Sequence, residues 1–273
     1  MKIKTHINRN SLLYFIHYSK NIIYDILLIF LLIFKKNLNT SDFKFVLISD
    51  SSHFKSSINL INSIYKFEKK PQIVFYDIGL LSEELQFLKD RYKLKIVKFE
   101  FNNYPSFISI RDSFNKLGSY AWKPVVLWNE YCLDKKNIIY LDAGCLLTKE
   151  LKLLKFVLRK VGYFSPESSN KVIDWTHEQT LKNLNVDSTL YNKRNISSGL
   201  LGFANNNLKV KELLKSWYEN SIIEENIAPK GSSRLNHRQD QAILTILTHQ
   251  KYNHLLLPRT HKMFGLLKHQ DVD

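Results

Sequence analysis

Apolar and polar residues follow two kinds of spacing along the chain, and together they predict alternating strands and helices. Short apolar runs alternate with stretches whose apolar residues recur every three or four positions. Continuous runs are typical of buried parallel strands, and the longer spacing is typical of helices. In the first half we expect strands at 44–50, 72–76, 94–101 and 137–141 and helices at 56–67, 83–90 and 124–132.

The second half is less regular but continues the pattern. We expect strands at 162–164 and 196–203, the latter interrupted by Gly199, helices at 177–184, 208–223 and 240–247, a polar loop at 229–237 and a loop or tail after Pro258. Repeated strand, helix, strand units predict an α/β fold, with a Rossmann-type, mostly parallel sheet and helices on both faces.

The most apolar segment lies near the N-terminus, at Ile22–Phe34, and has lysines at both ends. It is shorter than the roughly 20 residues of a membrane span, and Asp25 interrupts it. Three interpretations stay open: a helix packed on the domain, a helix in a membrane interface, or a tilted span. After a linker at 37–42 the pattern changes, so we divide the chain into an apolar, basic segment, 1–40, and one domain, 41–273.

Composition excludes several classes of protein. A chain of 273 residues with 44% hydrophobic residues can build a core, which excludes a disordered or collagen-like protein. Two cysteines exclude a disulfide framework and a four-thiolate zinc site, so a cytoplasmic location is expected.

The net charge of +15 suits nucleic acid, an anionic membrane surface or a phosphorylated substrate, although scattered solvated lysines explain it as well. No zinc-finger spacing and no concentrated basic helix occur, so we expect no nucleic-acid partner. The second expectation for location is a peripheral one, on the inner face of the membrane.

Three acids directly follow predicted strands: Asp50, Asp77 and Asp142. Ligands bind at the carboxyl ends of parallel strands, although any one such acid also suits a helix cap. Asp142 is followed by Ala143 and Gly144, whose small side chains leave room for a phosphorylated ligand and a divalent cation.

The segment 139–146 (IYLDAGCL) resembles the metal-binding DxD segment of nucleotide-sugar glycosyltransferases with the GT-A fold, family-8-type enzymes in particular. Three further segments resemble this family in the expected order: 48–64, 195–203 (NISSGLLGF) and 238–244 (RQDQAIL). The resemblance covers roughly residues 44 to 250 and implies a GT-A-like fold. It also implies transfer of a sugar from a nucleotide-diphosphate-sugar donor to a glycan or lipid-linked acceptor, in cell-surface glycan or lipopolysaccharide synthesis.

Site residues follow from this resemblance and from the chemistry of a diphosphate leaving group, which needs nearby positive charge. Asp174, beside Trp175, suits the acceptor side, while the resemblance places Asp240 and Gln241 near the reacting carbon. We expect the donor to be bound by Asp50, Ser52, Asp77, Lys123, Asp142, Ala143, Gly144, Ser198, Gly199, Lys230 and Arg238.

Gly144 stands where the family has its second acid. The resemblance therefore implies a Mn²⁺ or Mg²⁺ ion held by Asp142 and a late histidine, with His261 or His269 as candidates, or else weak or absent metal binding. Two other functions stay open: a sugar nucleotidyltransferase, although Ser49–His53 lacks the glycine-rich loop of that class, and a non-catalytic membrane-associated protein of the same fold.

Overall fold

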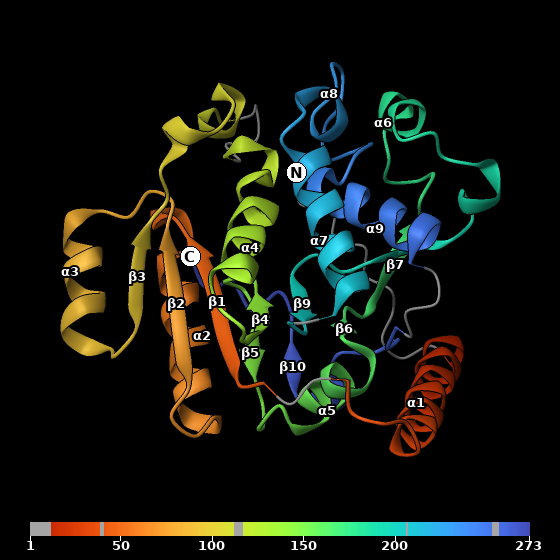
Figure 1. Ribbon diagram of the computed structural model, residues 1–273, viewed down its shortest axis with the longest axis horizontal. Coiled ribbons are helices and arrows are strands. Elements are labelled where there is room, and N and C mark those ends of the chain that lie inside the picture. The colour runs from red at the N-terminus through yellow and green to blue at the C-terminus, as the bar shows by residue number, and fades with distance from the viewer. Residues whose placement is uncertain (1–11, 39–40, 112–116, 206, 253–256) are drawn as a thin grey trace.

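A six-stranded sheet forms the centre of the protein in the computed structural model, which describes residues 12–38, 41–111, 117–205, 207–252 and 257–273 (Figure 1). The strand order is β3-β2-β1-β4-β9-β6. The first four of these strands are parallel, and β9 runs antiparallel to both of its neighbours. The strands are β1 (Phe43–Ser49), β2 (Gln72–Asp77), β3 (Lys95–Lys98), β4 (Asn137–Leu141), β6 (Tyr163–Phe164) and β9 (Leu200–Phe203).

Two small antiparallel sheets lie beside the central one and fix the second half of the chain. In one, β5 (Leu146–Leu147) pairs with β10 (Leu266–Leu267), so that residues after position 265 lie next to the segment that follows β4. In the other, β7 (Glu167–Lys171) pairs with β8 (Arg194–Ile196).

Helices cover both faces of the central sheet. In Figure 1, α4 lies in front of β4 and packs against α7, which in turn contacts α9, while α2 lies behind β1. The α-helices are α1 (Leu12–Ile33), α2 (Phe54–Phe67), α3 (Ser82–Arg91), α4 (Trp122–Leu133), α5 (Lys152–Val161), α6 (Glu178–Asn183), α7 (Leu208–Ser221), α8 (Glu224–Ile227) and α9 (Gln239–Lys251). Short 3₁₀ helices occur at Ser51–His53, Phe101–Asn103, Ser106–Ser109, Gly118–Tyr120, Ser188–Leu190 and Lys262–Phe264.

The core sits between the sheet and these helices. Every residue of β4 is buried, and Trp217 of α7 is fully buried against the front layer. The core also holds a buried ion pair. The Lys44 ammonium lies 2.6 Å from one carboxylate oxygen of Glu130, and the other carboxylate oxygen accepts a hydrogen bond from the Tyr76 hydroxyl. Since β1 and β4 are parallel neighbours, their carboxyl ends open at one edge of the sheet.

Helix α1 packs on the domain through one narrow stripe. Asp25, Leu28 and Leu32 are buried, and the Asp25 carboxylate accepts hydrogen bonds from the backbone N–H groups of Arg259 and Thr260, at 2.8 and 2.9 Å. Burial raises the pKa of Asp25, although these hydrogen bonds oppose it. The helix therefore docks through a polar clasp as well as apolar contacts.

The expected α/β class, the mostly parallel sheet and the N-terminal apolar helix are confirmed. Three local predictions need correction. The strand expected at 94–101 ends at Lys98, because a 3₁₀ helix begins at Phe101. The segment 196–203 is two strands in different sheets, since the chain bends at Gly199, where the Asp142 carboxylate leaves no room for a side chain. The segment after Pro258 contains a 3₁₀ helix and β10.

The division into 1–40 and 41–273 stays a prediction. Residues 1–11 of the first segment and residues 39–40 of the linker lie outside the described residues.

Candidate active site

A cavity of about 420 Å³ opens at the carboxyl ends of β1 and β4, a size within the usual range of small-molecule sites. The parts of the chain that line it include the turn after β1, the start of α4, the turn after β4, the bend before β9 and the start of α9. The segment 268–271, which follows β10, closes one side. Charged groups of both signs face this space.

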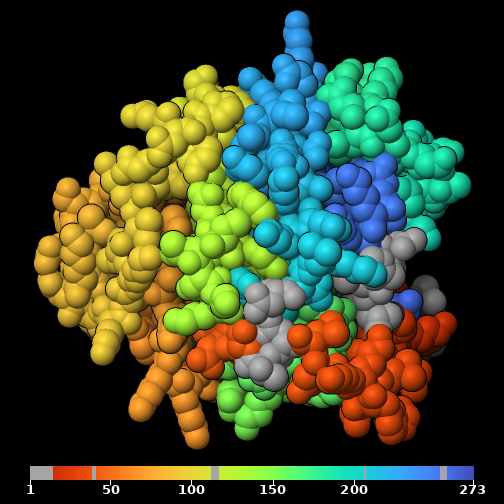
Figure 2. All heavy atoms as spheres, viewed as in Figure 1, coloured from red at the N-terminus to blue at the C-terminus, as the bar shows by residue number. Residues whose placement is uncertain are grey.

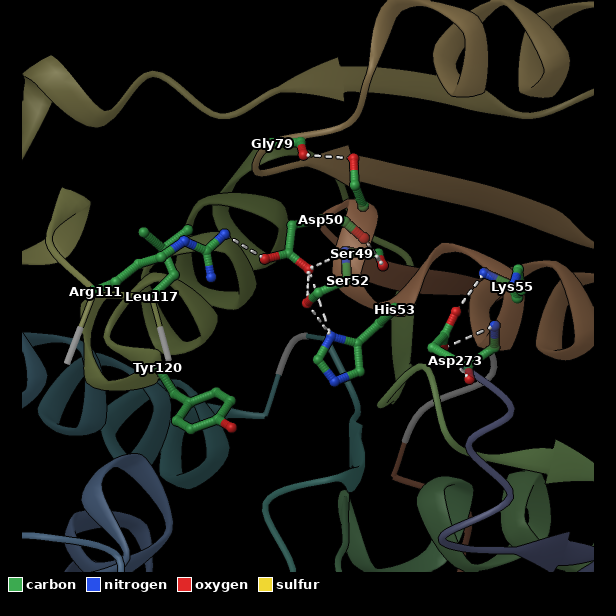
Figure 3. A network of polar contacts seen from close by, with 12 residues as sticks. Ser49, Asp50, Ser52, His53, Lys55, Gly79, Arg111, Leu117, Tyr120 and Asp273 are labelled. Carbon is green, nitrogen blue, oxygen red and sulfur yellow. Dashed lines mark hydrogen bonds and ion pairs between the residues drawn. The ribbon is translucent and has the colours of Figure 1, made fainter. Parts of the chain in front are cut away.

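Asp50 forms the first polar cluster, shown in Figure 3. Its Oδ2 lies 2.7 Å from the Arg111 guanidinium, and its Oδ1 accepts hydrogen bonds from the backbone N–H and the hydroxyl of Ser52, at 3.1 and 2.6 Å. Burial opposes ionisation, but contacts with His53, Ser52 and Arg111 hold the pKa of Asp50 well below its usual range. Asp50 is therefore a fixed anion at the end of β1.

Lys123 forms the second cluster and joins two acids from distant parts of the chain. Its ammonium is buried and lies 3.2 Å from an oxygen of Asp142 and 3.2 Å from an oxygen of Asp240. Burial would lower the pKa of Lys123, yet the two carboxylates raise it above its ordinary value. Burial also raises the pKa of Asp240, although Lys123 lowers it. One ammonium thus faces two acids, so the cluster has a net negative charge when both carboxylates are ionised.

The two carboxylates of this cluster keep oxygens that face the cavity. Oδ1 of Asp142 accepts a hydrogen bond from the Tyr140 hydroxyl at 2.5 Å, while Oδ2 lies against Gly199. Oδ2 of Asp240 is buried, and no donor among the described residues reaches it in hydrogen-bonding geometry, although the Lys123 ammonium is close. Both acids therefore have capacity for a further partner.

Three more cations line the cavity. The Arg238 guanidinium stacks on the Trp175 ring, 3.9 Å from its centroid, and Arg234 donates a hydrogen bond to the Tyr120 hydroxyl at 3.3 Å. Burial lowers the pKa of Lys268, although Cys145 and Asp142 oppose the shift. These groups place positive charge around a cavity that also holds carboxylates, as a diphosphate with a bound cation requires.

Most of the residues expected from the sequence meet in this cavity. They are Asp50, Ser52, Lys123, Asp142, Ala143, Gly144, Ser198, Gly199, Arg238, Asp240 and Gln241.

Four expected residues do not line the cavity. Asp77 caps a turn, because its carboxylate accepts the N–H groups of Gly79 and Leu80. Asp174 is exposed and accepts the N–H of Lys171. Lys230 points to solvent, and His261 is half-buried at the start of a 3₁₀ helix, whereas His269 lines the cavity.

Sequence reasoning missed three charged residues that the fold brings to the site: Arg111, Lys268 and Asp271. None follows a strand that the sequence predicted or belongs to a periodic segment, so no local pattern marked them. The only available signal for Lys268 and Asp271 was their place near His269 in the basic segment after Pro258.

Comparisons with known proteins give the fold. A family of proteins of unknown function (DUF1647) matches residues 10–128, from α1 into α4. No curated protein matches the chain.

Several solved glycosyltransferase structures are similar. The mannosyltransferase Ktr4p from S. cerevisiae is 11% identical, with a TM-score of 0.52 over 78% of this chain and 68% of that one. The galactosyltransferase LgtC, solved with donor and acceptor sugar analogues, is 14% identical, with a TM-score of 0.48 over 84% of each chain. The bifunctional glycosyltransferase WbbM is 14% identical, with a TM-score of 0.46 over 77% of this chain, which spans only 38% of WbbM.

The fold is therefore the GT-A fold of nucleotide-sugar glycosyltransferases, as the resemblance implied.

Proposed function

We propose that the protein is a glycosyltransferase that moves a sugar from a nucleotide-diphosphate-sugar donor to an acceptor. One observation carries the proposal: in a GT-A fold, a single cavity brings together the acids after β1 and β4, the acid at the start of α9, and a set of cations. The four segments that resemble the family-8-type enzymes contribute the acids and the glycine of this cavity.

Glycosyl transfer breaks the bond between the sugar and the diphosphate, so negative charge grows on the leaving oxygen. Lys268, Arg234 and Arg238 supply positive charge in the cavity for that oxygen. The ring of Trp175 and the backbone bond from Arg238 N–H to the Trp175 carbonyl, 3.0 Å long, hold Arg238 in place. The cations are thus fixed before the donor binds, as electrostatic catalysis requires.

Asp240 serves the sugar side of the reaction. Its buried Oδ2 lies 3.2 Å from the Lys123 ammonium but accepts no well-aligned hydrogen bond within the described chain, so it can accept one from a sugar hydroxyl. Gln241 follows on the same helix turn and lines the same cavity, where its amide both donates and accepts. These two side chains orient the sugar at the reacting carbon.

A divalent cation, Mn²⁺ or Mg²⁺, fits the acid after β4. The Asp142 side chain is 47% exposed, and Asp142 lines the cavity. Within the described ranges no group of three or more His, Cys, Asp or Glu side chains is placed to hold a metal. The ion would therefore take one or two carboxylates and complete its shell with phosphate oxygens and water, as Mg²⁺ commonly does.

The test is donor binding and turnover. A panel of nucleotide sugars is screened by thermal shift with and without Mn²⁺, on the wild type, on Asp142→Ala and on Asp90→Ala, a control acid exposed on α3. At least one donor should stabilise the wild type and the control, but not Asp142→Ala. If no donor stabilises the wild type, the proposal is wrong. Release of pyrophosphate from a nucleoside triphosphate and a sugar 1-phosphate, with no nucleoside diphosphate formed from any nucleotide sugar, would identify a nucleotidyltransferase.

We also propose that α1 holds the protein on an anionic membrane surface, where a lipid-linked acceptor of cell-surface glycan synthesis resides. Of the described helices, α1 is the one whose length and composition suit a membrane span, at Phe15–Ile33 with a mean hydropathy of 1.5. Most of its described apolar side chains are exposed, among them Ile23, Leu27 and Phe30. The helix as a whole lies on the outside of the molecule (Figure 2).

The clasp at Asp25 favours a helix that lies along the membrane surface. It binds the middle of α1 to the backbone at 259–260, so α1 cannot cross a bilayer without leaving the domain. Lys20, within α1, and Lys35 and Lys36, just after its C-terminal end, are exposed and complement anionic lipid headgroups. The protein would thus be peripheral, on the cytoplasmic face.

Vesicle flotation tests the membrane proposal. The wild type should float with vesicles that contain phosphatidylglycerol, less at high salt. The triple variant Ile23→Ser, Leu27→Ser, Phe30→Ser should bind on the order of 1,000-fold more weakly, because each side chain contributes roughly 1.5 kcal/mol or more. A matched pair away from α1, Leu208→Ser and Ile223→Ser, should bind like the wild type; both residues are exposed. Equal flotation of the triple variant, or none by the wild type, contradicts the proposal.

A further inference from the structure

Gly144 lies directly against the carboxylate of Asp271, an acid that lines the cavity. A Cβ atom built on Gly144 would lie only 2.4 and 2.5 Å from the two carboxylate oxygens of Asp271. Such a contact is far inside van der Waals range, so the Asp271 carboxylate fills the space where a side chain at position 144 would begin. Gly144 stands where the resembling family has its second acid, and here the carboxylate of Asp271 occupies that place.

The register of the small sheet explains how Asp271 reaches this place. Leu266 pairs with Leu147 and Leu267 with Leu146, in antiparallel register, so the chain beyond β10 runs back along the turn after β4. The N–H of Gln270 then donates a hydrogen bond to the Gly144 carbonyl at 2.8 Å. Asp271 follows directly and lines the same cavity as Asp142.

The segment is held on its other side by the start of α2. The N–H of Val272 donates to the Ser56 hydroxyl at 3.0 Å, and the Asp273 carboxylate accepts the N–H groups of Lys55 and Ser56, at 2.8 and 3.2 Å (Figure 3). Asp271 is thus flanked by two fixed residues. Its position is set by backbone contacts on both sides, and its carboxylate remains exposed toward the cavity.

Building on the proposed function, we propose that Asp271 supplies the second carboxylate of a divalent-cation site that it forms with Asp142. Carboxylate oxygens are the ligands that Mg²⁺ and Mn²⁺ take in proteins, and two of them suffice when phosphate oxygens and water complete the shell. A cation between the two acids also relieves the repulsion between them. The substrate-side partner of this site is a nucleoside diphosphate, and Lys268 lines the same cavity.

If Asp271 is a ligand, an acid at position 144 should be able to replace it. Mn²⁺ binding is measured by the electron paramagnetic resonance signal of the free ion, alone and with UDP or GDP, on the wild type and on Asp271→Asn, which should bind Mn²⁺ roughly ten-fold or more weakly. Asp90→Asn is the matched control, because it removes an exposed carboxylate on α3 that does not line the cavity, and should bind like the wild type. The double variant Asp271→Gly, Gly144→Asp should recover most of the lost affinity, since it returns the acid through position 144.

The single variant Gly144→Asp separates crowding from charge. With Asp271 in place, the new side chain has no room, so the variant should lower the melting temperature, and removal of Asp271 in the double variant should restore it. Unchanged Mn²⁺ affinity in Asp271→Asn overturns the inference, as does a wild type that binds no Mn²⁺ under any of these conditions. Nucleotide binding without metal dependence refutes the Asp271 site alone, whereas Mn²⁺ binding without any nucleotide binding refutes the proposed transferase alone.

Discussion

Replacement of Lys123 by methionine tests the cluster that joins the two halves of the site. Methionine keeps most of the length of the side chain and removes its charge, so two carboxylates lose their shared cation. At 3.2 Å, the attraction between Lys123 and the buried Asp240 is about 5 kcal/mol for an effective dielectric constant of 20. The pair with Asp142 contributes less, because that side chain is 47% exposed and water screens it.

We expect Lys123→Met to lower the free energy of unfolding by about 3 to 5 kcal/mol near pH 8, the usual result when a buried ion pair loses one partner. The loss should shrink as the pH falls. Burial already raises the pKa of Asp240, and without Lys123 it rises further. A raised folded-state pKa contributes stability below that pKa and loses it as the pH rises through it, so protonation of Asp240 offsets the missing cation in acid.

Urea unfolding at about pH 8 and about pH 5.5 measures both effects. Lys123→Met with Asp240→Asn should recover a large part of the loss, since the uncompensated buried charge is then gone. Lys44→Met is the matched control: Lys44 is equally buried in an ion pair, so its loss should destabilise the fold but leave nucleotide binding intact. A loss below about 1 kcal/mol for Lys123→Met, or one that Asp240→Asn does not reduce, would refute this account of the cluster.

Three further changes test other parts of the structure. Gly199→Ala places a Cβ atom 2.3 Å from Oδ2 of Asp142, so it should displace this acid and weaken metal-dependent nucleotide binding in calorimetry roughly ten-fold or more, with little loss of stability. Arg111→Gln should lower the unfolding free energy by about 1 kcal/mol at neutral pH, since the guanidinium is 39% exposed. Because the pKa of Asp50 is depressed, the difference in unfolding free energy between the wild type and Arg111→Gln should be fully present above about pH 4. It should become smaller below that pH in acid titrations. Burial lowers the pKa of His237 to about 4, so stability should fall by roughly 3 kcal/mol as the pH drops from about 6.5 to 4, and His237→Gln should remove most of this dependence.

The central sheet and half of the cavity were predictable because both depend on local patterns. The apolar runs of β1 and β4 are continuous, and parallel strands place Asp50 and Asp142 at one edge. Asp77 shows the limit of that argument: it ends a parallel strand as well, yet its carboxylate is used by the turn at Gly79. Position after a strand indicates where an acid lies, but not which donor takes its oxygens.

The rest of the site depends on contacts between residues far apart in the sequence. Asp174 and Trp175 were expected to act together because they are neighbours in the sequence. In the structure the Trp175 ring stacks on the Arg238 guanidinium, and Asp174 is exposed. Asp271 stands 127 positions from Gly144, and only the register of β10 on β5 brings them together. The spacing of residues along the sequence does not reveal such pairs, because tertiary packing alone brings their two segments together.

The hydrogen bonds between the 268–273 segment and the start of α2 also affect the order in which the protein folds. Asp273 bonds to Lys55, 218 positions earlier, whereas β1 and β2 pair across a single helix. During synthesis the N-terminal strands can associate long before residue 271 exists, and contacts of large sequence separation form late. A nascent chain would therefore carry Asp50 well before it has residues 268–271, so the lining of the cavity is assembled only after that segment has been made.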